Sequence, residues 1–163
     1  DEIVTIYPGY TPKTDAQFRS QGSSTVAKCV DIIKEGRYNL MIDGTFAGTT
    51  GASLNNVDRL INAGYLVWMY LMHDNVLTSW KYTRARELLT NRGIDQQGFL
   101  SACRNVPRNV KAAIEKHGDN NMFSIYVVKQ KELRDKNYSL MDDRTEIDEL
   151  LNKGYNIDEP LEL

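Results

Sequence analysis

An unbroken apolar run, Tyr65–Met72, constrains the fold of this 163-residue chain more than any other feature. A helical stripe precedes the run and ends at Gly64; it consists of Leu54, Val57, Leu60 and Ile61. A strand with one wet face alternates apolar and polar residues, whereas a continuous apolar strand indicates cover on both faces, as in a parallel sheet. The sequence therefore predicts a βαβ unit and an α/β fold, with a mostly parallel sheet flanked by helices.

The same helix–strand order occurs once earlier in the chain. A first helical stripe consists of Val26, Cys29, Val30 and Ile33, and Gly36 is its expected stop. The segment Tyr38–Ile42 then has the composition of a short buried strand, and it leads into Asp43. Two successive units of this kind strengthen the prediction of a parallel sheet.

The rest of the chain continues the alternation. The expected elements are a helix after Asp74, a helical stretch from about Asp95 to Lys116, a strand at Met122–Lys129, a short edge strand at Asn137–Met141 and a helix at Asp143–Lys153. Pro107 interrupts the second helical stretch, so we expect two helices or a kink there. The length fits one domain, residues 1–155, followed by an acidic tail at residues 156–163.

Charge and hydropathy exclude several classes of partner. The net charge is −2 and the pI about 5.7, which argues against a protein that binds nucleic acid through bulk charge. The longest apolar run is far shorter than the roughly 20 residues of a membrane span, and the chain shows no signal peptide pattern. We therefore expect no nucleic acid, no membrane association, and a cytoplasmic location.

The segment Asp43–Gly51 is the first candidate site. Ligands of open parallel sheets bind beyond the carboxyl ends of the strands, and this segment follows a predicted strand directly. It brings together a carboxylate, the hydroxyl of Thr45 and three glycines, which let backbone N–H groups approach a substrate closely. A plain strand-to-helix turn with threonine caps would use the same residues, so both interpretations stay open. His73, at the end of the next strand, is a further acid–base candidate.

Arginines form the second candidate site. Arg84, Arg86 and Arg92 surround an expected break between two helices, and Arg104 and Arg108 follow. Such a group suits a lid that closes on transferring phosphates, although solvated helix faces carry arginines too. The chain contains no Gly-x-x-x-x-Gly-Lys-[Ser/Thr] loop, no Gly-x-Gly-x-x-Gly array and no metal-ligand spacing of cysteines.

The order of these motifs resembles the zeta-toxin family of P-loop kinases. The run Gly36–Thr45, then a helix, then Ala63–Met72 is similar to the family's Glu-Gly-Thr strand, helix and Gly-Tyr strand. Asn105-Val-Pro-Arg-Asn109 resembles the family's Asn-Leu-Pro-x-Asn-Leu helix start, and Val127–Ser139 its terminal strand and hairpin. Asp1–Pro8 resembles the stretch that opens with the family's catalytic aspartate. The resemblance covers most of the chain.

The resemblance implies a kinase that moves the γ-phosphoryl of ATP or GTP, with Mg²⁺, onto a hydroxyl of a nucleotide-sugar such as UDP-N-acetylglucosamine. Some relatives phosphorylate other nucleotides such as NAD. Asp1 would be the general base, and Asp43 and Thr45 would hold substrate hydroxyls. Arg86 or Arg84, together with Arg92, would neutralise charge on the transferring phosphoryl, and Arg84 would otherwise bind substrate. A helical antitoxin-like protein is the partner that such a toxin implies.

Departures from the family pattern leave alternatives open. The family's first strand, phosphate loop and following helix would precede Asp1, so we expect a P-loop kinase-like fold that lacks them and a chain that is inactive alone. Val4, Ala27 and Ala47 stand where the family often has a basic residue, a glutamate and an arginine. A catalytically degenerate relative that serves as a protein-binding or inhibitory module would explain these changes. A third interpretation is another P-loop kinase, of nucleosides or polynucleotides, that matches by fold alone.

Overall fold

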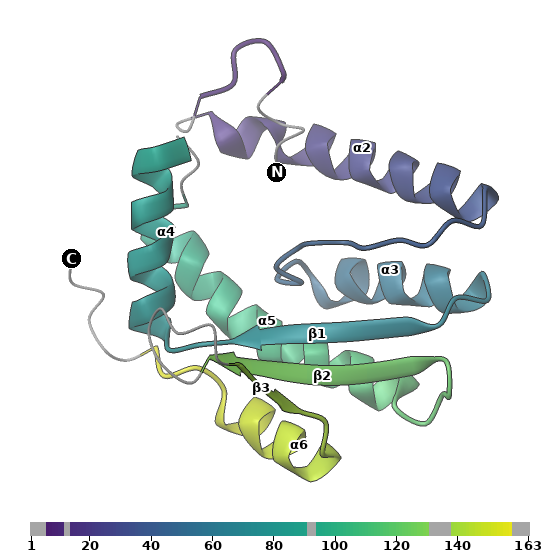
Figure 1. The fold of residues 1–163 in the computed structure, drawn as a ribbon. Coiled ribbons are helices and arrows are strands. Elements are labelled where there is room, and N and C mark those ends of the chain that lie inside the picture. The colour runs from purple at the N-terminus through teal and green to yellow at the C-terminus, as the bar shows by residue number, and fades with distance from the viewer. Residues whose placement is uncertain (1–5, 12–13, 91–93, 131–137, 158–163) are drawn as a thin grey trace. The chain divides into compact units, whose positions relative to one another are not determined.

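A computed structural model describes residues 6–11, 14–90, 94–130 and 138–157 (Figure 1). The chain divides into two compact units. One consists of Asp1–Asp43 and Arg84–Gly93, and the other of Gly44–Thr83 and Ile94–Leu163.

The second unit contains a three-stranded sheet, in the order β1-β2-β3 (Figure 1). Strand β1 (Val67–His73) pairs in parallel with β2 (Phe123–Gln130), and β2 pairs antiparallel with β3 (Tyr138–Met141). All three strands lie within two residues of their predicted positions. The sheet is therefore parallel with one antiparallel edge strand, and the predicted α/β class is confirmed.

Three helices of this unit bury one face of the sheet. They are α3 (Thr50–Asn62), α5 (Gln96–His117) and α6 (Arg144–Lys153). Their apolar stripes meet the inward side chains of the sheet in one core, which consists of Val57, Leu71, Val110, Ala113, Ile114, Phe123, Val127, Ile147 and Leu151. The helical spacing of three and four residues that predicted these helices places their buried side chains in this core.

The opposite face of the sheet is exposed within this unit. Trp68, Tyr70 and Met72 are 63%, 55% and 62% exposed, and Tyr70 stacks on its cross-strand neighbour Tyr126 at 5.1 Å between ring centroids. The apolar run of β1 predicted cover on both faces. The core helices of this unit supply that cover on one face only, because they all pack on the side of Leu71 and Val127.

Helix α5 runs through Pro107 as one helix, so the alternative of two helices is wrong, while the alternative of a kink stays a prediction. A proline lacks only its own N–H, which here removes the bond to the carbonyl of Cys103. The burial of Val110, Ala113 and Ile114 against the sheet stabilises the helix beyond that point. The Asp95 side chain caps the first turn by accepting from the N–H of Gly98 at 2.7 Å.

Helix α4 (Val76–Thr90) begins in the second unit, after β1. Its first turns pack in a smaller core where Trp80 meets Phe99 of α5, with ring centroids 5.0 Å apart. Tyr155 and Ile157, which follow α6, pack against the same cluster.

The first unit contains α2 (Asp15–Glu35), which ends before Gly36 as predicted. Tyr7 packs on it by stacking on Phe18, and its hydroxyl lies 3.0 Å from Thr25 Oγ1. The next segment, 38–42, is not a strand, so this prediction is wrong. A strand is held by hydrogen bonds to a neighbouring strand, and among the residues that the structure describes none pairs with this segment. Met41 within it is 95% exposed.

Candidate functional site

The loop that precedes α3 is the best-defined part of the candidate site. Phe46 lies in the left-handed region with φ of 52°, while its ring packs against the core of the second unit. Left-handed backbone costs a residue with a Cβ roughly 1–2 kcal/mol. Thr45, immediately before it, is exposed. The loop is therefore held in an unfavourable local conformation next to an exposed hydroxyl, which is a common feature of functional sites.

Asn109 of α5 holds this loop by its backbone. Its side chain is fully buried, and its Nδ2 donates to the carbonyl oxygens of Phe46 and Gly48, each at 2.9 Å. Its Oδ1 accepts from Thr50 Oγ1 at 2.8 Å. Nδ2 also donates to Ser53 Oγ, at 3.2 Å. The amide therefore uses both N–H groups and its carbonyl within one buried cluster.

Asn105, one helical turn earlier, holds the carbonyl between those two. Its Nδ2 donates to the carbonyl oxygen of Ala47 at 3.0 Å. Three consecutive loop carbonyls are thus turned toward α5. Because the C=O and N–H of a trans peptide point in opposite directions, the N–H groups of Ala47, Gly48 and Thr49 point away from the asparagine side chains. The loop therefore turns these N–H groups away from α5, and their use as donors to a ligand stays a prediction.

The asparagine pair is the part of the site that sequence reasoning missed. The motif Asn105–Asn109 was expected at a helix start, but it lies in the middle of α5, which begins at Gln96. A signal for Asn109 is present in the sequence, because it occupies a position of the buried stripe otherwise filled by Val106, Val110 and Ala113. A polar side chain on such a stripe must find partners inside the protein.

The predicted site residues fall in both units and partly outside the described residues. Asp1 and Arg92 lie outside them. Asp43 is exposed and belongs to the first unit, whereas Thr45 is exposed in the loop of the second. Arg84 and Arg86 lie on α4 within the first unit, where Arg84 forms an ion pair with Glu87 and Arg86 is exposed.

The two histidines have structural partners. His73, at the end of β1, stacks on Tyr155 with ring centroids 5.0 Å apart. Burial, with Lys129 adding to it, lowers the pKa of His73. Burial raises the pKa of Tyr155 to about 12. His117 ends α5 and its Nε2 lies 2.7 Å from Asp58 Oδ1 on α3. Neither arrangement adds a group to the loop before α3.

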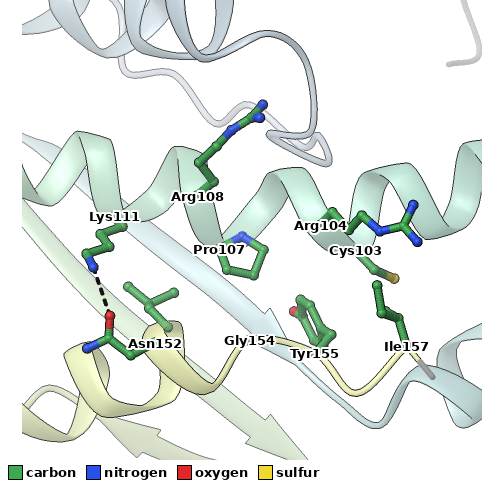
Figure 2. Close-up of a pocket in the computed structure, with 10 residues that line it drawn as sticks. Cys103, Arg104, Pro107, Arg108, Lys111, Asn152, Gly154, Tyr155 and Ile157 are labelled. Carbon is green, nitrogen blue, oxygen red and sulfur yellow. Dashed lines mark hydrogen bonds between the residues drawn. The ribbon is translucent and has the colours of Figure 1, made fainter. Parts of the chain in front are cut away.

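A shallow groove of about 430 Å³ lies between α5 and the segment after α6 (Figure 2). Lys111 Nζ donates to Asn152 Oδ1 at 2.8 Å along it, while the guanidinium of Arg108 points away from Tyr155 (Figure 2). Burial raises the pKa of the Cys103 thiol in its wall. The lining includes no residue of the loop before α3.

Two further observations concern ions and membranes. In the part of the chain that the structure describes, no three His, Cys, Asp or Glu side chains group as metal ligands. No helix there is long and apolar enough to cross a bilayer.

A mixed α/β unit, with a parallel pair of strands and a held loop before a helix, is compatible with a P-loop kinase-like fold. The chain belongs to the zeta toxin family, whose family model, Zeta toxin, matches residues 1–156. The predicted family is thereby confirmed, and family membership suggests a kinase-like function. Neither a curated protein nor a solved structure matches the chain.

Proposed function

We propose that the chain is the acceptor-binding part of a cytoplasmic kinase of zeta-toxin type. The reaction transfers the γ-phosphoryl of ATP or GTP to a hydroxyl of a nucleotide-sugar such as UDP-N-acetylglucosamine, and a helical antitoxin-like protein restrains the resulting toxicity. The observation that carries the proposal is the loop after Asp43, whose path is fixed by three hydrogen bonds from α5. Family membership over residues 1–156 supplies the reaction class.

Each predicted residue has a role that suits its chemistry. The Asp43 carboxylate accepts hydrogen bonds from sugar hydroxyls, and the exposed Thr45 hydroxyl donates or accepts a hydrogen bond of its own. Asp1 accepts the proton of the attacking hydroxyl. Arg86 and Arg92 stabilise negative charge on the transferring group, which is the main protein contribution in phosphoryl transfer. Arg84, whose guanidinium pairs with Glu87, contacts substrate as the family resemblance implies.

The nucleotide phosphates and Mg²⁺ are not assigned to residues of this chain. Its sequence has no Gly-x-x-x-x-Gly-Lys-[Ser/Thr] loop. The backbone N–H groups of the loop before α3 lie beside Thr45, which we propose binds the sugar that accepts the phosphoryl group. When bound with its metal, the nucleotide supplies the phosphoryl group. The roles above concern the acceptor, its proton and the charge around it.

Acceptor binding to this chain tests the proposal. Isothermal titration of UDP-N-acetylglucosamine should give saturable binding that Thr45→Ala weakens roughly three- to tenfold, the loss expected for one hydrogen bond. Thr145→Ala is the matched control, since Thr145 is an exposed threonine on α6. Equal affinities for the two variants would refute the role of Thr45. Binding of NAD or a nucleoside in place of the nucleotide-sugar would refute the proposed acceptor class.

A further inference from the structure

The side chain of Asn109 makes its shortest hydrogen bonds to the loop before α3 and to the first residue of that helix. It is 0% exposed, and all three of its shortest hydrogen bonds reach residues 46–50. The loop lies 59 or more residues away in the sequence, so these contacts are tertiary and not part of a local cap. A buried amide whose three shortest hydrogen bonds all reach residues 46–50 determines where that segment runs.

Only an amide fits this position chemically. Two loop carbonyls need donors, and the Thr50 hydroxyl needs an acceptor, which an asparagine side chain provides at once. A carboxylate would place oxygen against both carbonyl oxygens. An apolar side chain would leave the carbonyls of Phe46 and Gly48 without these donors. Unpaired buried polar groups are costly, so the loop would move to satisfy them elsewhere.

Asn105 extends the same contact along α5. Residues four apart lie on one face of a helix, so Asn105 and Asn109 face the loop together. The two amides hold the carbonyls of three successive residues, Phe46, Ala47 and Gly48. The left-handed backbone of Phe46 is compatible with this arrangement although it is unfavourable by itself. Hydrogen bonds from α5, and not the backbone preferences of the loop itself, thus determine the loop conformation.

We propose that Asn105 and Asn109 are positioning residues of the acceptor site, which act by fixing the backbone that presents Thr45. This proposal rests on the proposed function, because it assigns a role in acceptor binding. It makes α5 a second determinant of the site, although neither asparagine needs to touch the acceptor. Substituting either residue should loosen the loop and weaken acceptor binding together.

Hydrogen–deuterium exchange of the whole chain measures the first effect without any ligand. Asn109→Ala should raise exchange at Ala52 and Ser53 about tenfold or more beyond wild type, because their N–H groups bond to Thr49 of the loop that loses its contacts with Asn109. Asn105→Ala, which loses one bond, should give a smaller rise. Val110→Ala is the matched control, because Val110 is a neighbouring core residue that is 1% exposed and faces the sheet. Equal local exchange in Asn109→Ala and Val110→Ala would overturn the proposal.

Affinity for UDP-N-acetylglucosamine measures the second effect. Asn109→Ala should weaken binding roughly tenfold, while Val110→Ala should leave it unchanged at a temperature where both variants are folded. If Thr45→Ala weakens binding and Asn109→Ala does not, the positioning role is wrong and the proposed function stands. If neither variant changes binding, the proposed function is wrong, and the exchange result alone decides whether the amides hold the loop.

A third pair of variants keeps the test decisive if Asn109→Ala fails to fold. Thr50→Val removes the hydroxyl that donates to Asn109 Oδ1, whereas Thr50→Ser keeps it. The valine variant should raise loop exchange roughly threefold or more, and the serine variant should restore the wild-type rate. The same exchange in both variants would show that the Asn109 amide does not organise the loop.

Discussion

Replacement of the side-chain amide of Asn109 by a carboxyl group is the sharpest test of its buried hydrogen bonds. Asn109→Asp keeps the shape of the side chain but replaces the Nδ2 donor with an oxygen. Two hydrogen bonds of 2.9 Å become contacts between oxygen atoms, and a carboxylate becomes buried at a position with 0% exposure. Each lost bond with its unpaired carbonyl costs about 1–3 kcal/mol. We therefore expect a loss of about 3–5 kcal/mol in the free energy of unfolding at pH 7.

The loss should depend on pH in a direction opposite to that of an ordinary surface carboxylate. Burial and the facing carbonyls raise the folded-state pKa of the new carboxyl group, so the folded variant binds a proton more readily than the unfolded one. Its stability therefore rises as the pH falls through that pKa, because the protonated carboxyl regains one donor.

Urea unfolding followed by circular dichroism measures both effects. The deficit of Asn109→Asp relative to wild type should be larger at pH 7.5 than at pH 5. Asn109→Ala serves as the uncharged comparison. Its loss in unfolding free energy relative to wild type should not change with pH, because alanine has no titrating group. A deficit below about 1 kcal/mol at pH 7.5, or one that grows on acidification, would refute the assignment of Nδ2 as a buried double donor.

Three further predictions concern the surrounding fold. The hydrogen bond from Lys116 chiefly lowers the pKa of Asp58 below its ordinary 3.8, so this carboxylate stabilises the fold at neutral pH and the contribution is lost as the pH falls through the lowered value. Asp58→Asn should cost about 1 kcal/mol in urea unfolding at pH 7 and progressively less as the pH falls below 3.8, and a deficit that does not shrink on acidification would contradict this. Ile147→Ala should cost about 2–5 kcal/mol in the same assay, because Ile147 is 0% exposed in the core; a cost below 1 kcal/mol would place it elsewhere. In an absorbance titration Tyr155 should ionise at about pH 12, and Tyr155→Phe should remove signal there and not near pH 10.

Most of the second unit could be predicted from the sequence because its signals are periodic. The spacing of Val57 and Leu60 indicates a helix whatever its neighbours are, and the apolar run Tyr65–Met72 indicates a strand. The helix start at Asp143 follows from its side chain, which accepts from the N–H of Glu146 at 3.0 Å. Such signals are local, so they can be recognised in the sequence without knowledge of the tertiary structure.

The errors arose where the outcome depends on a distant neighbour. The segment 38–42 has the composition of a strand, but a strand also needs a hydrogen-bonded partner, and composition does not supply one. Pro107 predicted an interruption, but the apolar face around Val110 keeps α5 continuous. The place of Asn109 on a buried stripe indicates that it needs partners inside the protein, but the stripe does not say which, because these carbonyls lie more than fifty residues away.

The site predictions divide in the same way. The loop containing Thr45 was singled out because its glycines and hydroxyl side chains follow segment 38–42, which is not a strand. The structure holds this loop by hydrogen bonds from α5, and its role in binding stays a prediction. The roles of Asp1, Asp43 and the arginines come from the family resemblance, and they stay predictions. A contact made by a side-chain amide to backbone carbonyls leaves no mark on the sequence of the loop itself, which is why the second determinant of the site was not anticipated.

That contact has a consequence for redesign. Asn105 and Asn109 bond to the main chain, so the identity of Gly48 is free to change while the path of the loop is kept. A Cβ added at Gly48 would meet only Ser53 Oγ at 3.6 Å, an ordinary van der Waals separation. One scaffold could thus display different chemical groups beside Thr45, and new ligand preferences could be installed there without rebuilding the helix that supports it.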